Sequence, residues 1–201
     1  MRLVFASNNA HKLDEVRRIL PAGIEVLSLS DIGFEAEIEE TGTTLEQNSY
    51  IKASTVAAFI NDGMSASLND EMMIDGVFAD DTGLEIDALG GQPGVYTARW
   101  AGEPAANRKK ALAELKGITD RGAQFRTVIT LIRMTGERLA VSGVVRGRIA
   151  EEEYGQGGFG YDPVFIPEGY DKTFGELPAE VKNSISHRSR ALQALVKALN
   201  C

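Results

Sequence analysis

The sequence has few features that would cross-link the chain or place it in a membrane. Its one cysteine is Cys201, so no disulfide can form within the chain, and a reducing compartment is expected. No apolar run is long enough for a transmembrane helix, and the start at Met1-Arg2-Leu3 lacks a signal-peptide pattern. These absences predict a cytoplasmic protein without a membrane partner.

Positive charge is also scarce, with 21 Lys and Arg against 29 Asp and Glu and a formal net charge of −8. Nucleic-acid-binding proteins usually carry a basic surface, so this balance argues against such a partner. A free nucleotide stays compatible, because it needs only a local group of cations. The chain has 201 residues, 43% of them hydrophobic, and no visible linker, which predicts a single domain over 1–201.

The most informative segment runs from Val77 to Gly102, where an apolar strand leads into two adjacent carboxylates and then into glycine-rich chain. On an extended backbone, the side chains of Asp80 and Asp81 point to opposite faces, so one of them is expected to meet an ion. We favour Asp81, which precedes Thr82, and keep Asp80 in reserve. Mg²⁺ binds through carboxylates, water and phosphates. A solvated turn is the alternative interpretation.

A second segment joins a short buried strand at residues 2–6 to a helix near residues 10–20. Ser7 and Asn9 are typical turn and cap residues, and the helix start presents free N–H groups at the positive end of the helix dipole. Phosphate suits that position. Lys12 adds a cation there, although an ordinary capped helix with a surface lysine would look the same.

A third segment places Glu40 before a helix expected near residues 44–60. Glu40 is a candidate second metal ligand, or simply an acid favoured near a helix N-terminus. Thr44 and Gln47 have capping-box spacing, which explains part of this segment without any ligand. Lys52 lies two turns into the helix and is either a phosphate contact or a surface residue.

A glycine-rich segment, residues 155–165, has four glycines in its first six positions and the aromatic residues Phe159 and Tyr161. Glycine permits backbone conformations that other residues resist, so a planar ligand could stack on these rings. A flexible turn is the alternative. Further on, Ser186 resembles a helix cap, and His187 and Arg188 follow it where the dipole disfavours cations. An anionic or hydrogen-bond-accepting ligand would justify them.

Five motifs of this kind follow one another in the order SNNAHK, EETG, ADDTGL, GGFGYDPVF and KNSISHR. In this order the chain resembles the inosine/xanthosine triphosphate pyrophosphatase family, the house-cleaning nucleotide hydrolases also called Ham1-like, over nearly its whole length. The resemblance implies an α/β fold with a mixed, elongated central sheet, flanking helices and two lobes around a nucleotide cleft, usually as a homodimer. It implies Mg²⁺-dependent hydrolysis of ITP, dITP and XTP to monophosphate and pyrophosphate, which clears them from the nucleotide pool.

The resemblance also assigns roles to single residues. It makes Asp81 the general base and pairs it with Glu40 as a metal ligand. It gives substrate contacts to Ser7, Asn8, Asn9, Ala10, His11 and Lys12 at the triphosphate, to Lys52 at a phosphate, to Thr82, to Phe159, Gly160, Tyr161 and Asp162 at the base, and to Lys182, His187 and Arg188 elsewhere on the nucleotide.

The expected chemistry needs no covalent nucleophile. Metal-held water has a lowered pKa, and a carboxylate can take its proton as it attacks the α-phosphorus. Because a metal-ligating carboxylate is a poor base, Asp81 does either task or both at different stages. A 6-keto purine presents an acceptor to donors such as His187 and Arg188, whereas adenine would leave donors facing a donor. The exclusion of guanine is not explained.

Strands and helices alternate irregularly along the chain, so a mixed sheet is favoured over a doubly wound one. Strands are expected at 2–6, 24–28 and 76–80, with extended segments over 84–88 and a hairpin of 124–134 and 138–150. Helices are expected at 10–20, 44–60, 104–116 and from Ser186. Residues 61–76 are interpreted as an insertion. Two other functions stay open: a pyrophosphatase for modified pyrimidines, and a non-catalytic nucleotide-binding protein.

Overall fold

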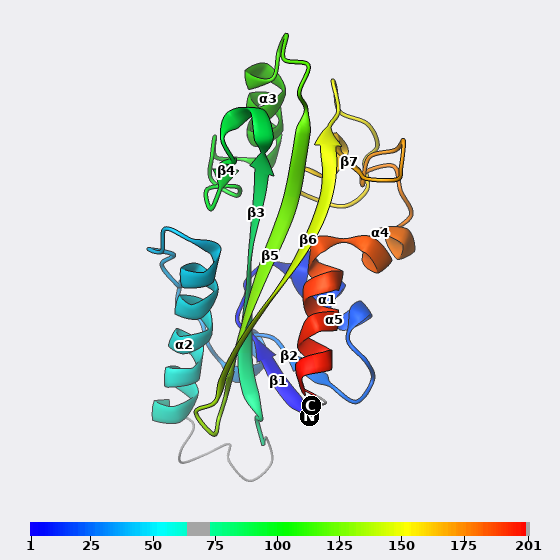
Figure 1. Ribbon diagram of the computed structural model, residues 1–201. Helices are drawn as coiled ribbons and strands as arrows, with labels where there is room; N and C mark the ends of the chain where they lie inside the picture. Colours follow the sequence, from blue (N-terminus) through cyan, green and yellow to red (C-terminus); the bar gives the residue numbers. More distant parts are fainter. Residues whose placement is uncertain (64–72, 200–201) are drawn as a thin grey trace. The chain divides into compact units, whose positions relative to one another are not determined.

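A computed structural model describes residues 1–63 and 73–199 of the chain (Figure 1). Its strands are β1 (Arg2–Phe5), β2 (Glu25–Leu27), β3 (Gly76–Ile86), β4 (Gln92–Gly94), β5 (Gly122–Arg133), β6 (Arg138–Ile149) and β7 (Phe165–Pro167). Its α-helices are α1 (Ala10–Ile19), α2 (Leu45–Gly63), α3 (Pro104–Glu114), α4 (Ala179–Ile185) and α5 (His187–Leu199). Most of the expected insertion lies outside the described residues, and its first three residues are the end of α2.

The strands form one sheet with the order β2-β1-β3-β5-β6-β7, and β4 pairs with β3. β1 pairs in parallel with β2 and with β3, whereas β3–β4 and β6–β7 are antiparallel. Both kinds of pairing occur in the same sheet, so the predicted mixed α/β fold is confirmed. The expected nucleotide cleft stays a prediction.

The described chain forms two compact units, and the first comprises Met1–Asp81, Val128–Ser142 and Ala191–Cys201. Successive residues of a strand face opposite sides of a sheet. Val77 accordingly packs in a core with residues of α2, and Phe78 packs in a second core with residues of α1 and α5. Figure 1 shows α2 on one side of these strands and α1 and α5 on the other. The first unit is therefore a sheet covered by helices on both faces.

The second unit comprises Thr82–Thr127 and Gly143–Arg190. Its single large core joins Leu84 of β3, Phe125 of β5, Val145 of β6 and Leu115, which follows α3. Tyr161, from the glycine-rich segment, belongs to the same core. This core fixes the glycine-rich segment against the strands that carry it.

One expectation about β3 is wrong. The two aspartates were expected at the end of a strand that is followed by chain too glycine-rich to pack as core. Instead β3 continues to Ile86, and Leu84 and Ile86 are fully buried. Pairing with β4 over residues 84–86 keeps this half of the strand in the sheet. The aspartates therefore occupy the middle of a buried strand, where their positions are fixed on both sides.

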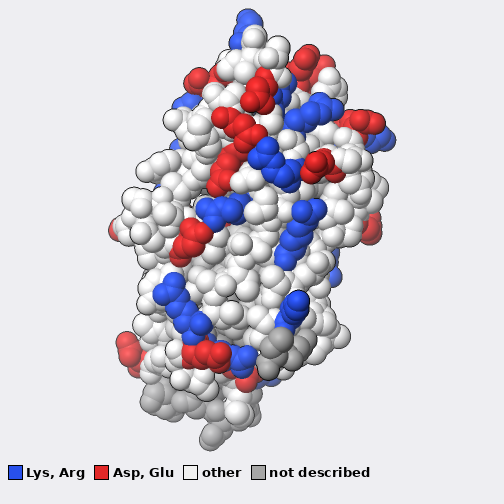
Figure 2. All heavy atoms as spheres, viewed as in Figure 1, with Lys and Arg blue, Asp and Glu red and all other residues white. Residues whose placement is uncertain are grey.

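The face drawn in Figure 2 carries Lys and Arg side chains interspersed with Asp and Glu. Charges of both signs alternate over this face rather than gathering into one broad field. In the part of the chain that the structure describes, no helix combines the length and the apolar character needed to cross a membrane.

Candidate active site

The N-terminus of α1 is built by the residues that were expected to contact phosphate. Asn9 is the N-cap, and its Oδ1 accepts a hydrogen bond from the Lys12 N–H at 3.1 Å. The Ser7 hydroxyl oxygen accepts from the Asn9 N–H at 3.3 Å. No acidic residue occupies the first turn, so the positive end of the helix dipole is not offset locally. Asn8, Ala10 and His11 are exposed at this helix start, where a phosphate group could reach them.

Asp80 is held by the first of two lysines. The Lys12 Nζ lies 2.9 Å from Asp80 Oδ1, and Asp80 is 1% exposed. This pair connects the α1 N-terminus to the middle of β3. Asp80 is therefore engaged with a cation from its own unit, and Asp81 takes different partners, as expected for neighbouring residues of a strand.

Lys52 of α2 joins the two predicted metal ligands. Its Nζ lies 2.6 Å from Glu40 Oε1 and 3.0 Å from Asp81 Oδ1. Asp81 is 7% exposed and Lys52 is equally buried. With the Lys12–Asp80 pair, this arrangement brings together three carboxylates and two ammonium groups, which we call the carboxylate–lysine cluster. Its formal charge is −1, a balance that suits an additional cation.

Burial and charge perturb two groups of this cluster. Burial alone would lower the pKa of the Lys52 ammonium, but the charges of Asp81, Asp80 and Glu40 outweigh it and raise that pKa above its usual value. Burial also raises the pKa of the Asp81 carboxyl; Lys52 opposes this rise and Glu40 adds to it. Asp81 therefore binds a proton more readily than an exposed aspartate, which is a useful property in a general base.

The cluster has the donors for a hard cation. Among residues 1–63 and 73–199, no three Asp, Glu, His or Cys side chains are grouped as a metal site. Glu40 and Asp81 are thus a set of two carboxylates, and both already contact one cation, the Lys52 ammonium. Mg²⁺ typically uses one or two carboxylates together with water and substrate phosphates, so this donor set fits it.

The loop before α2 is fixed by Asn48, a residue that was not expected in the site. Its Oδ1 accepts from the Gly42 N–H at 2.8 Å, and its Nδ2 lies 3.4 Å from Asp81 Oδ2. A Cβ at Gly42 would lie 2.6 Å from that Oδ1, so a larger residue would displace the amide. Asn48 therefore ties the Glu40 loop to Asp81. The sequence signal was weak, because a buried asparagine in a helix usually has a structural role.

The predicted capping box of α2 is confirmed in a modified form. The Thr44 hydroxyl accepts from the Gln47 N–H at 3.2 Å, as in a standard capping box. The Gln47 side chain reaches back one residue further than usual and accepts from the Thr43 N–H at 2.7 Å. Gln47 therefore stabilises the helix start without carrying a charge.

In the second unit, Asp162 and Lys182 form a buried ion pair beneath the glycine-rich segment. Lys182 Nζ lies 2.6 Å from Asp162 Oδ2, with exposed fractions of 5% and 4% for the two residues. The same oxygen accepts from the Phe159 N–H at 2.7 Å. Lys182 also lies over the Phe159 ring, 4.6 Å from its centroid. The pair therefore fixes both the backbone and the ring of Phe159.

Two arrangements in this segment differ from a simple stacking loop. Gly158 and Gly160 have φ angles of 70° and 61°, so the predicted need for glycine is confirmed at these positions. Tyr161 is 4% exposed and its hydroxyl donates to the Thr97 carbonyl at 3.2 Å. Burial raises the pKa of Tyr161 accordingly. Its ring is core, so stacking of a planar ligand depends on the half-buried Phe159.

His187 and Arg188 begin α5, after the predicted cap Ser186, whose hydroxyl accepts from the Ser189 N–H at 3.2 Å. The Arg188 guanidinium carbon lies 5.7 Å from the Phe159 ring centroid, and Arg188 Nη2 lies 3.4 Å from Thr82 Oγ1. We use the name base-side cluster for the side chains of Thr82, Phe159, Lys182, His187 and Arg188. It combines an aromatic ring with several hydrogen-bond donors.

Two residues near this cluster escaped the sequence analysis. Thr127 of β5 lies between Thr82 and His187, and Arg108 of α3 donates from Nη1 to the Gly160 carbonyl at 2.9 Å. A threonine in an alternating strand and an arginine on a helix carry no local signal of function. Only the fold brings them to the predicted residues.

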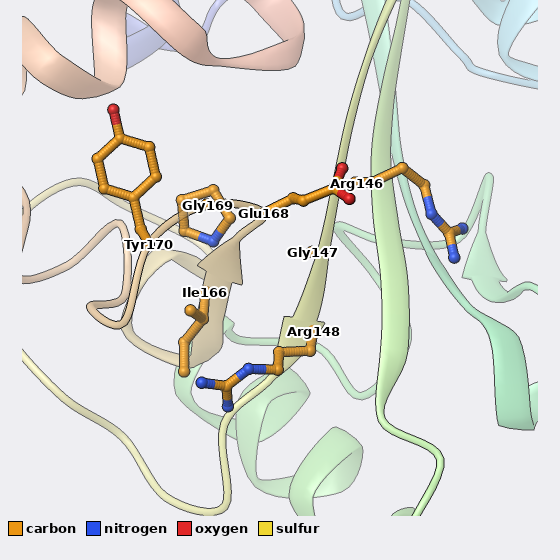
Figure 3. A pocket seen from close by; sticks show the side chains of 8 residues that line it. Arg146, Gly147, Arg148, Ile166, Glu168, Gly169 and Tyr170 are labelled. Carbon is orange, nitrogen blue, oxygen red and sulfur yellow. The ribbon is translucent and has the colours of Figure 1, made fainter.

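A separate hollow of about 310 Å³ lies in the second unit, between β6 and the turn after β7 (Figure 3). Arg146 and Arg148 extend away from each other in this view. Arg146 already donates from Nη2 to Asp87 Oδ2 at 2.6 Å. The charged groups around this hollow therefore do not converge on a common point.

The fold is that of an α/β protein with a mixed sheet. The helix N-terminus beside the carboxylate–lysine cluster in the first unit has the chemistry that suits a phosphorylated ligand. The model of the Ham1 family matches residues 3–198, and the chain belongs to that family. The predicted family is thereby confirmed.

Individual relatives agree over nearly their full lengths. The dITP/XTP pyrophosphatase of Bacillus subtilis is 48% identical, over 98% of this chain and 96% of its own. That of Flavobacterium johnsoniae is 46% identical, over 99% and 98%. The structure of the Staphylococcus aureus Ham1 protein matches with a TM-score of 0.84 and 39% identity, covering 100% of this chain and 98% of that one.

Proposed function

We propose that this pyrophosphatase of the Ham1 family hydrolyses ITP, dITP and XTP to the nucleoside monophosphate and pyrophosphate. The relatives named dITP/XTP pyrophosphatase support this substrate class. Within the structure, the proposal depends chiefly on one observation: Asp81 is buried in a cluster of two lysines and three carboxylates. Clearing such nucleotides from the pool would be the role of the enzyme, in the cytoplasm and as a homodimer.

The triphosphate is proposed to bind at the N-terminus of α1 and at the two lysines. Phosphoryl transfer depends mainly on positioning and on neutralising charge. Lys12 and Lys52 supply two positive charges, and the first turn of α1 supplies N–H groups at the positive end of its dipole. Ser7, Asn8 and Asn9 lead into this turn, so their polar groups are available to the same phosphates.

Glu40 and Asp81 would hold Mg²⁺. When bound there, the ion would neutralise phosphate charge and lower the pKa of water. Lys52 contacts both carboxylates and so holds their side chains close to one another. Asn48 restrains the second oxygen of Asp81 in the same way.

Asp81 is proposed to take the proton of the water that attacks the α-phosphorus. Its carboxylate is fixed by Lys52 and Asn48, so one oxygen can accept the proton without rotation of the side chain. Because burial raises the pKa of Asp81, the protonated form is more stable than at an exposed position. Pyrophosphate then leaves, and its charge is balanced by the lysines.

Base selection is proposed to depend on donors of the base-side cluster. Arg188 offers only donors, and Phe159 offers a ring on which a purine can stack. A 6-keto purine presents an acceptor to such donors. Adenine presents an amino group, and each buried polar group left unpaired costs about 1–3 kcal/mol.

The test is pyrophosphate release from ITP, XTP, ATP and GTP, with and without Mg²⁺, by the native chain, Asp81→Asn and Asp62→Asn. Asp62 is an exposed residue of α2 and serves as a matched control. Mg²⁺-dependent release from ITP and XTP that is lost only in Asp81→Asn supports the proposal. Equal turnover of all four nucleotides contradicts base selection, and absence of release contradicts the enzymatic function.

A further inference from the structure

Arg108 of α3 contacts the chain on both sides of residues 154–159 in the second unit. Its Nη1 donates to the Gly160 carbonyl at 2.9 Å, and its Nε lies 2.9 Å from Glu153 Oε2. The Nε atom is buried and makes no hydrogen bond in the part of the chain that the structure describes, so it is attracted to Glu153 by charge. One side chain therefore joins the start of the glycine-rich loop to its last glycine.

Hydrogen bonds within the chain fix the shape of the turn that carries Phe159. Asp162 Oδ2 accepts from the Phe159 N–H at 2.7 Å, and the Asp162 N–H donates to the Phe159 carbonyl at 3.1 Å. These two contacts close residues 159–162 on themselves, and the φ of 61° at Gly160 lets the chain turn between them. They join the turn only to itself, so its place in the unit depends on contacts with other elements.

Two cations from different helices attach this turn to the second unit. Lys182 of α4 contacts the Asp162 carboxylate, and Arg108 of α3 donates to the Gly160 carbonyl. Among the residues that the structure describes, no other donor contacts that carbonyl. A hydrogen bond from a charged donor is stronger than one between neutral groups. Loss of the guanidinium would therefore detach the turn from α3.

Glu153 restricts the guanidinium that holds the turn. An arginine side chain has many rotamers, and ordering it costs entropy that a nearby carboxylate helps to offset. Because the guanidinium is planar, a contact at Nε also limits the positions of Nη1. The side chain of Arg108 is 17% exposed and that of Glu153 is 35% exposed, so solvent weakens their attraction. Glu153 therefore assists the hydrogen bond to Gly160 with a smaller contribution of its own.

We propose that Arg108 is a positioning residue for Phe159: by holding the Gly160 carbonyl, it keeps the turn where the aromatic ring can stack on the purine. The proposal rests on the proposed function, in which Phe159 receives the base. It adds α3, whose residues have no assigned contact with the nucleotide, to the elements that set nucleotide affinity.

The first measurement is amide hydrogen exchange at the Phe159 N–H in the whole, ligand-free protein. This N–H is hydrogen-bonded to Asp162 and exchanges when the turn opens. We expect Arg108→Met to speed its exchange about 10-fold relative to amides of the first unit, near the worth of one hydrogen bond. Lys109→Met, at the exposed neighbour on α3, is the matched control. Unchanged exchange in Arg108→Met, or equal acceleration in the control, overturns the proposal whatever the enzyme hydrolyses.

The second measurement compares KM and kcat for ITP in the same variants. A displaced turn weakens binding equally before and during the reaction, so KM should rise about 10-fold in Arg108→Met while kcat changes little. A merely structural role would instead lower the folded fraction, and with it kcat, at an unchanged KM. That result, or an equal rise of KM in Lys109→Met, refutes the proposal.

Glu153→Gln keeps the proposal testable if Arg108→Met does not fold, because this partly exposed side chain can be changed at little cost to the fold. We expect it to speed exchange at Phe159 and to raise KM for ITP, each about 2-fold, as suits a partly screened ion pair. If both quantities keep their native values in Glu153→Gln and Arg108→Met does not fold, the proposal is overturned.

The two measurements separate this inference from the proposed function. A native chain that releases no pyrophosphate contradicts the proposed function and, with it, the assigned use of the Phe159 ring. Hydrogen exchange still decides whether Arg108 holds the turn. A native enzyme that hydrolyses ITP, combined with native exchange and native KM in Arg108→Met, supports the proposed function and overturns the inference.

Discussion

Breaking the ion pair of Asp162 and Lys182 should destabilise the protein strongly, although neither residue is apolar. The two charges are 2.6 Å apart and almost completely buried. Lys182→Met keeps an apolar stem over the Phe159 ring but leaves the carboxylate without its cation. Removing one partner of a buried pair typically costs about 3–5 kcal/mol, because the other charge stays in a poorly solvating environment.

The cost should be smaller when both charges are removed. In the double variant Asp162→Asn/Lys182→Met, the asparagine oxygen can still accept from the Phe159 N–H. We expect a loss of about 1–2 kcal/mol, near that of an ordinary buried hydrogen bond. For a chain of this size, about 3–5 kcal/mol corresponds to a fall in Tm of roughly 6–20 °C.

Urea denaturation of the native chain, both single variants and the double variant completes a double-mutant cycle. KM for ITP should rise in Lys182→Met, because the pair also positions Phe159. Two results would refute the reasoning: a cost below about 1 kcal/mol for Lys182→Met, or a double variant that loses as much as the two single variants combined.

Three further predictions concern the carboxylate–lysine cluster. Asp81→Asn should lower kcat at least about 100-fold without lowering the free energy of unfolding at pH 7 in EDTA. Burial raises the pKa of Asp81 in the folded state, so Asp81 contributes fully to the free energy of unfolding only below its unfolded pKa. This contribution is lost as the pH rises through the folded pKa. A lower free energy of unfolding for Asp81→Asn than for the native chain in urea at pH 7 would contradict this. Gly42→Ala should lower the free energy of unfolding by roughly 1–3 kcal/mol, because the added Cβ displaces Asn48. Gly23→Ala is the control and should lower it little, because the space at its Cβ is open. Equal melting temperatures of the two variants would exclude the clash. Chelation of Mg²⁺ should abolish pyrophosphate release, and Glu40→Gln should raise the Mg²⁺ needed for half-maximal activity at least about 10-fold, whereas an unchanged titration removes Glu40 from the metal site.

The sequence predicted those parts of the fold that carry a local pattern. The helix that became α1 and the hairpin of β5 and β6 have regular periodicity and recognisable ends. β4, β7 and α4 were not expected: β4 (QPG) and β7 (FIP) each contain a proline, which is unusual within a strand, and the 7 residues of α4 are too few for a helical period to show. Their structure depends on the neighbours with which they pair or pack.

The candidate site was predictable as residue types but not as an arrangement. Asp81 and Lys52 were recognised separately, yet their contact depends on how α2 packs against β3. Tyr161 looked like a ligand platform, and its burial follows from a core to which distant strands contribute. Thr127 had no signal at all, because the two residues that its hydroxyl contacts lie 45 and 60 residues away in sequence.

The Lys52 ammonium contacts both Glu40 and Asp81, so the protein itself supplies the counterion of these two carboxylates. A divalent ion bound as proposed by Glu40 and Asp81 would share or replace this tethered monovalent charge. In the absence of such an ion, the positive charge of Lys52 offsets the repulsion between the two carboxylates, so this repulsion does not drive them into the solvent. The repulsion between the two carboxylates is therefore offset by Lys52 when the chain folds, before any ligand binds.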